Sequence, residues 1–347
     1  MNKKMLGLVG GLVAIGAVIA YGSMSSSDKA APKGDRPEGH VTVRLGHFPN
    51  ITHAPALVGV AREDFEKALG EASDLDVKVV NAGPEAMEAL LAGELDVTYV
   101  GPSPAINTYI KSEGKALRVI SGVCSGGASL VATKESGIRG IKDLNGKKVA
   151  TPQLGNTQDV SLRSFIAKEG LQPKDKGGQV EIIPTKNPDI LMLFKQKQID
   201  AAWVPEPWAS RIVEETGAVR VIDERDLWPD KKFTTTVMVA RTEFADRHPE
   251  LVAKLVEANA QIIDWMNANT KDAQKLVNEQ LAKLTGKPLK DSLLEESWKY
   301  MEFTSDPMEW CFDQFAISAK ECGFLKNVPD DMKNMFDLTA LKAVSKP

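Results

Sequence analysis

From residue 41 onward, short apolar runs alternate with longer segments in which apolar residues recur at helical spacing. Strands alternating with helices are typical of an α/β fold with mainly parallel sheets. The predicted strands span 41–48, 77–81, 97–100, 117–124, 129–133, 148–151, 180–184, 201–204, 219–222 and 234–241. The predicted helices span 54–69, 84–93, 103–112, 157–169, 187–197 and 207–216, and the chain after 248 reads as helical almost to its end.

One eight-residue pattern occurs twice in related form. Residues 95–102 read LDVTYVGP and residues 199–206 read IDAAWVPE, so an aromatic residue, Tyr99 or Trp203, closes each apolar run. The aspartates of the two copies, Asp96 and Asp200, are 104 positions apart. Such a repeat predicts two similar α/β lobes. Because ligands bind at the carboxyl ends of strands in open α/β sheets, we expect Tyr99 and Trp203 to face one cleft.

The order of elements also predicts how the chain is divided. It leaves the first lobe near 125–132 and returns near 233–238. We therefore expect lobe I to comprise residues 41–128 and 237–347, with the C-terminal helices packed on it, and lobe II to comprise 129–236. Two extended hinge strands between the lobes would permit closure around a ligand.

Polar residues stand where the predicted strands end and the next helices begin. In these positions a side chain or a free backbone N–H can hold an anionic ligand. The alternative is that the side chain only caps the helix. The same two alternatives, ligand-facing hydroxyls or ordinary strand residues, apply to the run Thr234–Thr236. The candidate ligand-binding residues at strand ends and helix starts are Asn50, Thr52, His53, Ser103, Asn156, Thr157 and Gln158.

The hexapeptide WVPEPW at 203–208 is the most distinctive local sequence. An indole face suits an apolar tail or an ammonium group. Glu206, if it lies in the cleft, would favour a cationic or zwitterionic ligand. The alternative for Trp208 is a buried plug, since tryptophan is highly buried on average.

Composition limits the other classes of function. The net charge is −4 and Lys and Arg form no long run, which argues against nucleic acid as a partner. The four histidines and three cysteines lack metal-ligand spacing, so we expect no metal and no cofactor. Cys311 and Cys322 could pair if the protein is exported.

The N-terminus predicts export. Lys3 and Lys4 precede an apolar stretch that ends at Tyr21, which is the pattern of a secretory signal. We expect a signal peptide or an uncleaved membrane anchor at 1–22 and a flexible linker at 23–40. Either way, the body of the protein would lie in the periplasm, outside the cytoplasm.

Several motifs together resemble one family over roughly residues 41–325. They are RLGHFP at 44–49 with THA at 52–54, GELDVTYVGP at 93–102, DLNGKKV at 143–149, GNTQ at 155–158 and EPW at 206–208. These segments resemble periplasmic solute-binding proteins of ABC importers, and above all the group that binds aliphatic sulfonates, taurine, nitrate or bicarbonate, and thiamine-precursor pyrimidines.

The resemblance implies a two-lobed type II periplasmic-binding-protein fold and a binding protein rather than an enzyme. It implies that lobe closure captures a small oxyanion-bearing solute, an aliphatic sulfonate or taurine. It also implies that the protein is a monomer and delivers the solute to a membrane permease and its ATPase. Nitrate, bicarbonate or a pyrimidine precursor is the alternative ligand, and a hydrolytic or biosynthetic enzyme with His53 as general base is the alternative activity. Taurine and sulfonate binders of the family often carry a Ser/Thr-rich turn with a histidine at the start of the second lobe's helix, whereas this chain has GNTQD at 155–159. The resemblance implies a ligand held by Asn50, Thr52, His53, Tyr99, Ser103, Asn156, Thr157 and Trp203.

Overall fold

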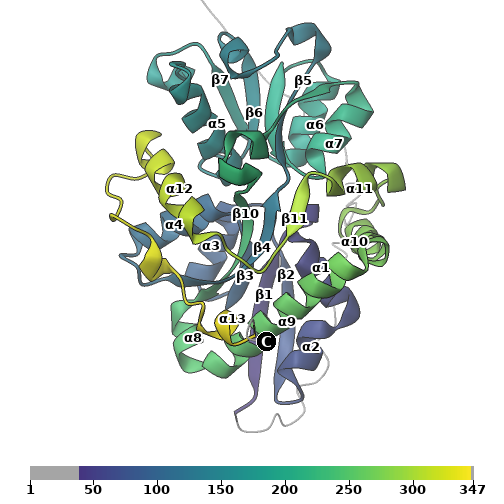
Figure 1. Cartoon of the computed structure of the whole chain (residues 1–347), viewed down its shortest axis with the longest axis vertical. Helices are drawn as coiled ribbons and strands as arrows, with labels where there is room; N and C mark the ends of the chain where they lie inside the picture. The colour runs from purple at the N-terminus through teal and green to yellow at the C-terminus, as the bar shows by residue number, and fades with distance from the viewer. Residues whose placement is uncertain (1–38, 345–347) are drawn as a thin grey trace, which may run out of the picture. The chain divides into compact units, whose positions relative to one another are not determined.

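A computed structural model describes residues 39–344. The expected signal or anchor at 1–22, and the expected linker as far as residue 38, lie outside the described residues. Figure 1 shows the two β-sheets of the described part, each accompanied by helices.

The first sheet has six strands in the order β11-β4-β10-β3-β1-β2. Strand β1 pairs in parallel with β2 and β3, whereas β10 runs antiparallel to β3 and β4. Its strands are β1 (Val41–His47), β2 (Ser73–Val79), β3 (Val97–Val100), β4 (Leu117–Gly126), β10 (Thr234–Arg241) and β11 (Met301–Phe303). The helices between its early strands are η1 (Ile51–His53), α1 (Ala54–Arg62), α2 (Asp64–Leu69), α3 (Gly83–Leu91) and α4 (Pro102–Lys111).

The second sheet has five strands in the order β7-β6-β8-β5-β9. These strands are β5 (Ala128–Ala132), β6 (Lys148–Pro152), β7 (Glu181–Thr185), β8 (Ala201–Pro205) and β9 (Val219–Asp223). Its main helices are α5 (Thr157–Lys168), α6 (Asn187–Lys195) and α7 (Trp208–Thr216), and its short ones are η2 (Lys134–Ser136), η3 (Ile141–Leu144), η4 (Lys174–Lys176), η5 (Glu224–Leu227) and η6 (Pro229–Lys231).

The sheets are less parallel than the sequence pattern predicts. Strand β5 is antiparallel to both β8 and β9, and β10 and β11 are antiparallel to β4. Parallel neighbours need a long crossover between them, usually a helix. Strands β5 and β10 instead begin where the chain changes sheets: β5 follows β4 of the first sheet through a single residue, Gly127, and β10 follows β9 of the second sheet through only the short helices η5 and η6. The α/β fold class is confirmed, but both sheets are mixed.

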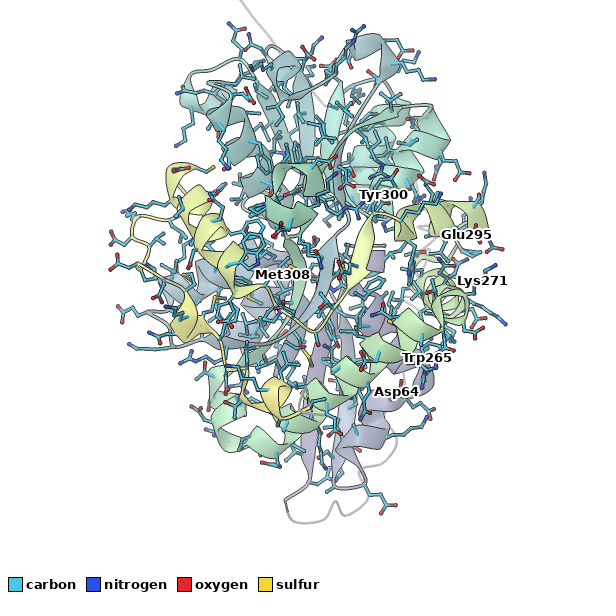
Figure 2. All side chains as sticks on the ribbon, viewed as in Figure 1. Asp64, Trp265, Lys271, Glu295, Tyr300 and Met308 are labelled. Atoms are coloured by element: carbon cyan, nitrogen blue, oxygen red, sulfur yellow. The ribbon has the colours of Figure 1, made fainter. Side chains whose placement is uncertain are left out.

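The passage from β4 to β5 requires glycine. Gly126 and Gly127 have φ of +75° and +77°, and a Cβ on either would lie 2.6 Å from Tyr300 O or Met301 Cγ. Tyr300, labelled in Figure 2, lies just before β11, and its carbonyl accepts a hydrogen bond from Gly127 N at 2.7 Å. The guanidinium of Arg220 on β9 stacks over the Tyr300 ring at 3.6 Å. Close packing therefore surrounds this connection between the sheets.

The C-terminal helices are α8 (Thr242–Arg247), α9 (Pro249–Ala268), α10 (Thr270–Thr285), α11 (Asp291–Trp298), α12 (Glu309–Glu321) and α13 (Thr339–Val344), with η7 (Lys333–Met335) before the last. Helix α9 buries an apolar face that includes Leu255 and Ile262 against α1, α2 and β4. Helix α12, however, contacts both α4 and α5, and α11 contacts α7. The C-terminal helices therefore pack on elements of the first sheet, as expected, and α11 and α12 also contact helices of the second sheet.

Cysteine does not cross-link the described part of the chain. Cys124 and Cys311 are buried thiols and Cys322 is a partly buried one, so the structure does not support a Cys311–Cys322 pair. Burial raises the pKa of the Cys311 thiol to about 12 and that of Cys322 to about 11. Such thiols remain protonated and unreactive at neutral pH.

Candidate ligand-binding site

Strand ends and helix starts from both sheets line one small polar cavity. The first sheet and its loops contribute Phe48, Asn50, Thr52, His53, Asn81, Gly101, Thr235 and Thr236. The second contributes Pro152, Asn156, Thr157, Gln158, Asn187 and Pro205. About 20 Å³ of free space remains between them, which is room for about one water molecule. The two walls therefore lie close together, and a larger solute would require them to separate.

The local fold gives this cavity a positive electrostatic character. Gly101 precedes the first turn of α4, Asn156 caps α5, and Asn187 begins α6. The dipole at a helix N-terminus favours a negative charge, as do its free N–H groups, although Pro102, Pro104 and Pro188 supply none. No lining residue carries a charged side chain. The cavity therefore suits an anion that is held by dipoles and hydrogen bonds rather than by an ion pair.

In the first wall, Asn50 and His53 are held in defined orientations. The Asn50 Oδ1 accepts a hydrogen bond from the indole Nε1 of Trp208, across the cleft, at 3.1 Å. The backbone N–H of Phe48 donates to His53 Nδ1 at 3.4 Å, and the Phe48 ring stacks on the imidazole at 4.3 Å. Burial lowers the pKa of His53 well below its usual range, so the ring is neutral near pH 7.

In the second wall, two buried polar atoms lack hydrogen-bond partners. The Asn156 Oδ1 caps helix α5 by accepting from Thr157 N at 3.0 Å. Thr157 Oγ1 and Asn187 Oδ1 are buried and have no partner among the described residues. Leaving a buried polar atom unsatisfied costs about 1–3 kcal/mol. Such atoms in a cavity wall indicate that a polar ligand completes the site.

Six of the ten predicted site residues line this cavity, namely Asn50, Thr52, His53, Asn156, Thr157 and Gln158. Tyr99 and Trp203 do not, and the expectation that they face one cleft is wrong. Tyr99 is fully buried beside α9, where its hydroxyl donates to Asn259 Oδ1 at 2.8 Å. Trp203 is fully buried in the second sheet's core, stacked on Phe165. Both faces of β3 and β8 are buried, so their aromatic side chains enter the cores.

Ser103 and Glu206 also lie outside the cavity lining. Ser103 is buried near the start of α4, and its Oγ has no partner within the described residues. Glu206 is fully buried; Arg220 donates to its Oε1 at 2.6 Å and Ser210 N donates to its Oε2 at 3.2 Å. Because both of its oxygens are engaged, Glu206 is not positioned to hold a cationic ligand.

Three further residues that were not predicted as site residues also line the cavity, namely Phe48, Asn81 and Asn187. Each stood at the end of a predicted strand or the start of a predicted helix, so the rule applied to Asn50 and Thr157 would have found them. Thr235 and Thr236 line the cavity, which agrees with the ligand-facing alternative for the run Thr234–Thr236. The Thr235 hydroxyl also donates to Gly126 O, at the connection between β4 and β5.

Comparison with known proteins agrees with this architecture. The model of the NMT1-like family matches residues 36–282. The chain belongs to that family. It is 30% identical over 271 residues to a candidate binding protein of Brucella abortus (strain 2308), covering 71% of this chain and 80% of that protein. It is also 28% identical over 236 residues to the taurine-binding periplasmic protein of Escherichia coli (strain K12), covering 67% of this chain and 70% of that one.

Solved structures support the fold. The alkanesulfonate-binding protein SsuA from Xanthomonas axonopodis pv. citri, bound to MOPS, superposes with a TM-score of 0.68 at 18% sequence identity, covering 82% of this chain and 94% of that one. The expected type II periplasmic-binding-protein fold is thereby confirmed.

The NMT1-like chain is therefore a substrate-binding protein of an ABC importer, related to sulfonate-, taurine- and nitrate-binding proteins. These relatives also confirm that it is a binding protein and not an enzyme. None of the described helices has the length and hydropathy needed to cross a bilayer.

Proposed function

We propose that this protein captures a small oxyanion with an aliphatic tail, and that aliphatic sulfonates are its ligand class. One observation carries the proposal: hydrogen-bonding side chains and helix N-termini converge on a cavity whose lining carries no charged side chain. Backbone N–H groups at helix starts are a general anion-binding device. The names of relatives that bind taurine or alkanesulfonate support the same class.

The composition of the lining favours a sulfonate over a smaller inorganic anion. A sulfonate has three acceptor oxygens and a single negative charge, which hydroxyl, amide and imidazole groups can meet from several directions. Phe48, Pro152 and Pro205 add apolar surface to the same cavity. Nitrate and bicarbonate have no tail to cover that surface. The apolar residues are therefore accounted for by an alkyl chain.

Capture would proceed by closure. The site residues come from both sheets, so a bound solute would bridge the two walls and favour the closed form, and the walls would first separate to admit a solute larger than one water molecule. In this proposal residues 41–128 and 237–347 move as one lobe and 129–236 as the other. The closed protein, a periplasmic monomer, then delivers its solute to the permease and ATPase of the importer. It contacts the membrane only through its N-terminal segment or the permease.

The test is a thermal-shift and calorimetric screen of the purified protein. Ethanesulfonate and butane-1-sulfonate are compared with nitrate, bicarbonate and an aminopyrimidine. A ligand at about 100 times its Kd should add about 2.7 kcal/mol of stability. Stabilisation by the sulfonates is the expected result. Stabilisation by nitrate, bicarbonate or the pyrimidine alone would contradict the proposal.

A matched pair of variants locates the site. Thr157→Val removes an unpartnered hydroxyl at the first residue of α5, and Thr270→Val makes the same change at the exposed first residue of α10. A hydrogen bond to a charged group contributes about 1.5–3 kcal/mol, so Thr157→Val should weaken sulfonate binding about tenfold or more. Thr270→Val should leave it unchanged. Equal affinities of the two variants would place the sulfonate elsewhere.

A further inference from the structure

Three cavity-lining side chains have their acceptor atoms already occupied by donors of the protein. The Oδ1 of Asn50 receives the Trp208 indole N–H, and the Oδ1 of Asn156 receives Thr157 N–H. His53 receives the Phe48 backbone N–H at Nδ1, so its neutral ring carries the proton on Nε2. These side chains therefore keep their N–H donors free, two amide N–H₂ groups and one imidazole N–H, and each amide oxygen keeps only one further lone pair.

The carboxylates next to the cavity in sequence are engaged elsewhere. Glu206, which follows the lining residue Pro205, is held by Arg220 and Ser210 N. Asp159, which follows Gln158, is fully buried and accepts from Thr151 Oγ1 at 2.9 Å, Gly155 N at 2.9 Å and Arg163 Nε at 3.2 Å. Neither acid lines the cavity, so neither is placed to neutralise a positive charge there.

Three other lining amides, those of Asn81, Gln158 and Asn187, are not fixed in this way. Asn187 Oδ1 is buried and accepts no hydrogen bond from the described residues. The orientation of this amide is therefore not fixed by a hydrogen bond to its oxygen. An amide exchanges its oxygen and nitrogen by a half-turn, so Asn187 can offer either group. These amides and the threonine hydroxyls of the lining supply only neutral acceptors, which are weak compensation for a desolvated ammonium group.

We infer that the site discriminates against a sulfonate that carries an ammonium group, and that Trp208 is a positioning residue for this selectivity. The inference rests on the sulfonate proposal above and narrows it to uncharged tails. An ammonium group inside the cavity would face donors and the positive ends of helices, and no acid lines the cavity to pair with it. Trp208 acts through Asn50: its indole N–H holds the amide oxygen away from the ligand and thereby turns the N–H₂ group toward it.

Two ligands of equal heavy-atom count provide the direct test. Taurine and propane-1-sulfonate differ only in the terminal group, which is ammonium in the first and methyl in the second. Calorimetry should give propane-1-sulfonate a Kd at least about 30-fold lower than that of taurine, equivalent to about 2 kcal/mol. Equal or tighter binding of taurine would overturn the inference and leave the sulfonate proposal standing. If neither compound nor any other sulfonate binds, the proposed function itself fails.

The role of Trp208 is tested with Trp208→Phe, which keeps an aromatic ring and removes the indole N–H. Without that donor, Asn50 can turn its oxygen toward the ligand, so propane-1-sulfonate should bind about tenfold more weakly while taurine changes less. The preference for propane-1-sulfonate over taurine should therefore shrink. Trp310→Phe, at a tryptophan of α12 that is 46% exposed, is the matched control and should leave the preference intact.

A double substitution separates positioning from a general structural effect. Asn50→Ala removes the amide that Trp208 orients, so adding Trp208→Phe to Asn50→Ala should change the ligand preference no further. A loss of affinity for both ligands by the same factor in Trp208→Phe, or independent effects in the double variant, would show that Trp208 only supports the fold. The thermal midpoint of each variant is measured alongside to confirm that it is folded.

Discussion

Glu224 is a fully buried carboxyl whose ionisation should make the stability of this protein fall as the pH rises. It lies on η5 beneath α5 and accepts hydrogen bonds from Ser161 Oγ at 2.8 Å, Trp203 Nε1 at 2.6 Å and Trp228 Nε1 at 3.3 Å. Burial raises the pKa of Glu224 from 4.5 to about 7, although these donors oppose the shift. The native state therefore keeps a proton that the unfolded chain has already lost.

The size of the effect follows from proton linkage. Between pH 4.5 and pH 7 the native state binds one more proton at Glu224 than the unfolded state does, so the free energy of unfolding decreases with pH across that interval. Below pH 4.5 both states are protonated, and above pH 7 both are ionised, so the contribution is flat. With these two pKa values, raising the pH from 5 to 8 removes about 2.5 kcal/mol of stability.

The assay compares the wild-type protein with Glu224→Gln by urea denaturation at pH 5 and pH 8, with tryptophan fluorescence as the signal for unfolding. Glutamine does not ionise, so the variant should lack this 2.5 kcal/mol decrease, and subtracting the two curves cancels the other titrating groups. The variant should also be less stable than wild type at pH 5, because an amide has one acceptor oxygen for three donors. Glu295→Gln, exposed on α11 (Figure 2), is the control. If wild type and Glu224→Gln lose stability in parallel, within about 1 kcal/mol, the argument from burial is wrong.

Two further substitutions test buried polar contacts. Arg163→Ala should destabilise the protein by about 3 kcal/mol or more, because it leaves the fully buried Asp159 without its ion-pair partner. The control, Arg139→Ala at an exposed position, should lower stability little. Similar urea midpoints for the two variants would contradict this prediction. Tyr99→Phe should lower stability by about 1–2 kcal/mol through loss of its hydrogen bond to Asn259. It should not change sulfonate affinity. A loss of binding measured by calorimetry would show that Tyr99 belongs to the binding site.

The alternation of apolar and polar residues was sufficient to predict most elements of the fold. Strands such as Val97–Val100 and Thr234–Arg241 were predicted with the bounds that the structure shows, because each is an apolar run between turn residues. Strand β11 was missed, since three residues between helices carry no periodic signal and pair only because β4 lies beside them. The mixed direction of the sheets was also missed, because direction depends on how the chain crosses between sheets rather than on any local pattern.

Site residues could be predicted only where their position after a strand places them at the ligand-binding edge of a sheet. Asn50, His53, Asn156 and Thr157 were found because strands that end at one edge of a sheet bring their following residues together. Tyr99 and Trp203 satisfied the same rule of position but point into the cores, because burial on both faces of their strands leaves no polar face to distinguish inside from outside.

The alternation of strands and helices, the two-lobed architecture and the loops that form the site follow from local apolar patterns and from turn and cap residues. What those loops offer a ligand depends instead on contacts between distant parts of the chain. Asn50 becomes a donor because Trp208, 158 residues away in the chain, occupies its oxygen, and Glu206 is removed from the site because Arg220 pairs with it. Hydrogen-bond polarity and burial are set by neighbours in space, and the order of residues along the chain does not specify which neighbours those will be.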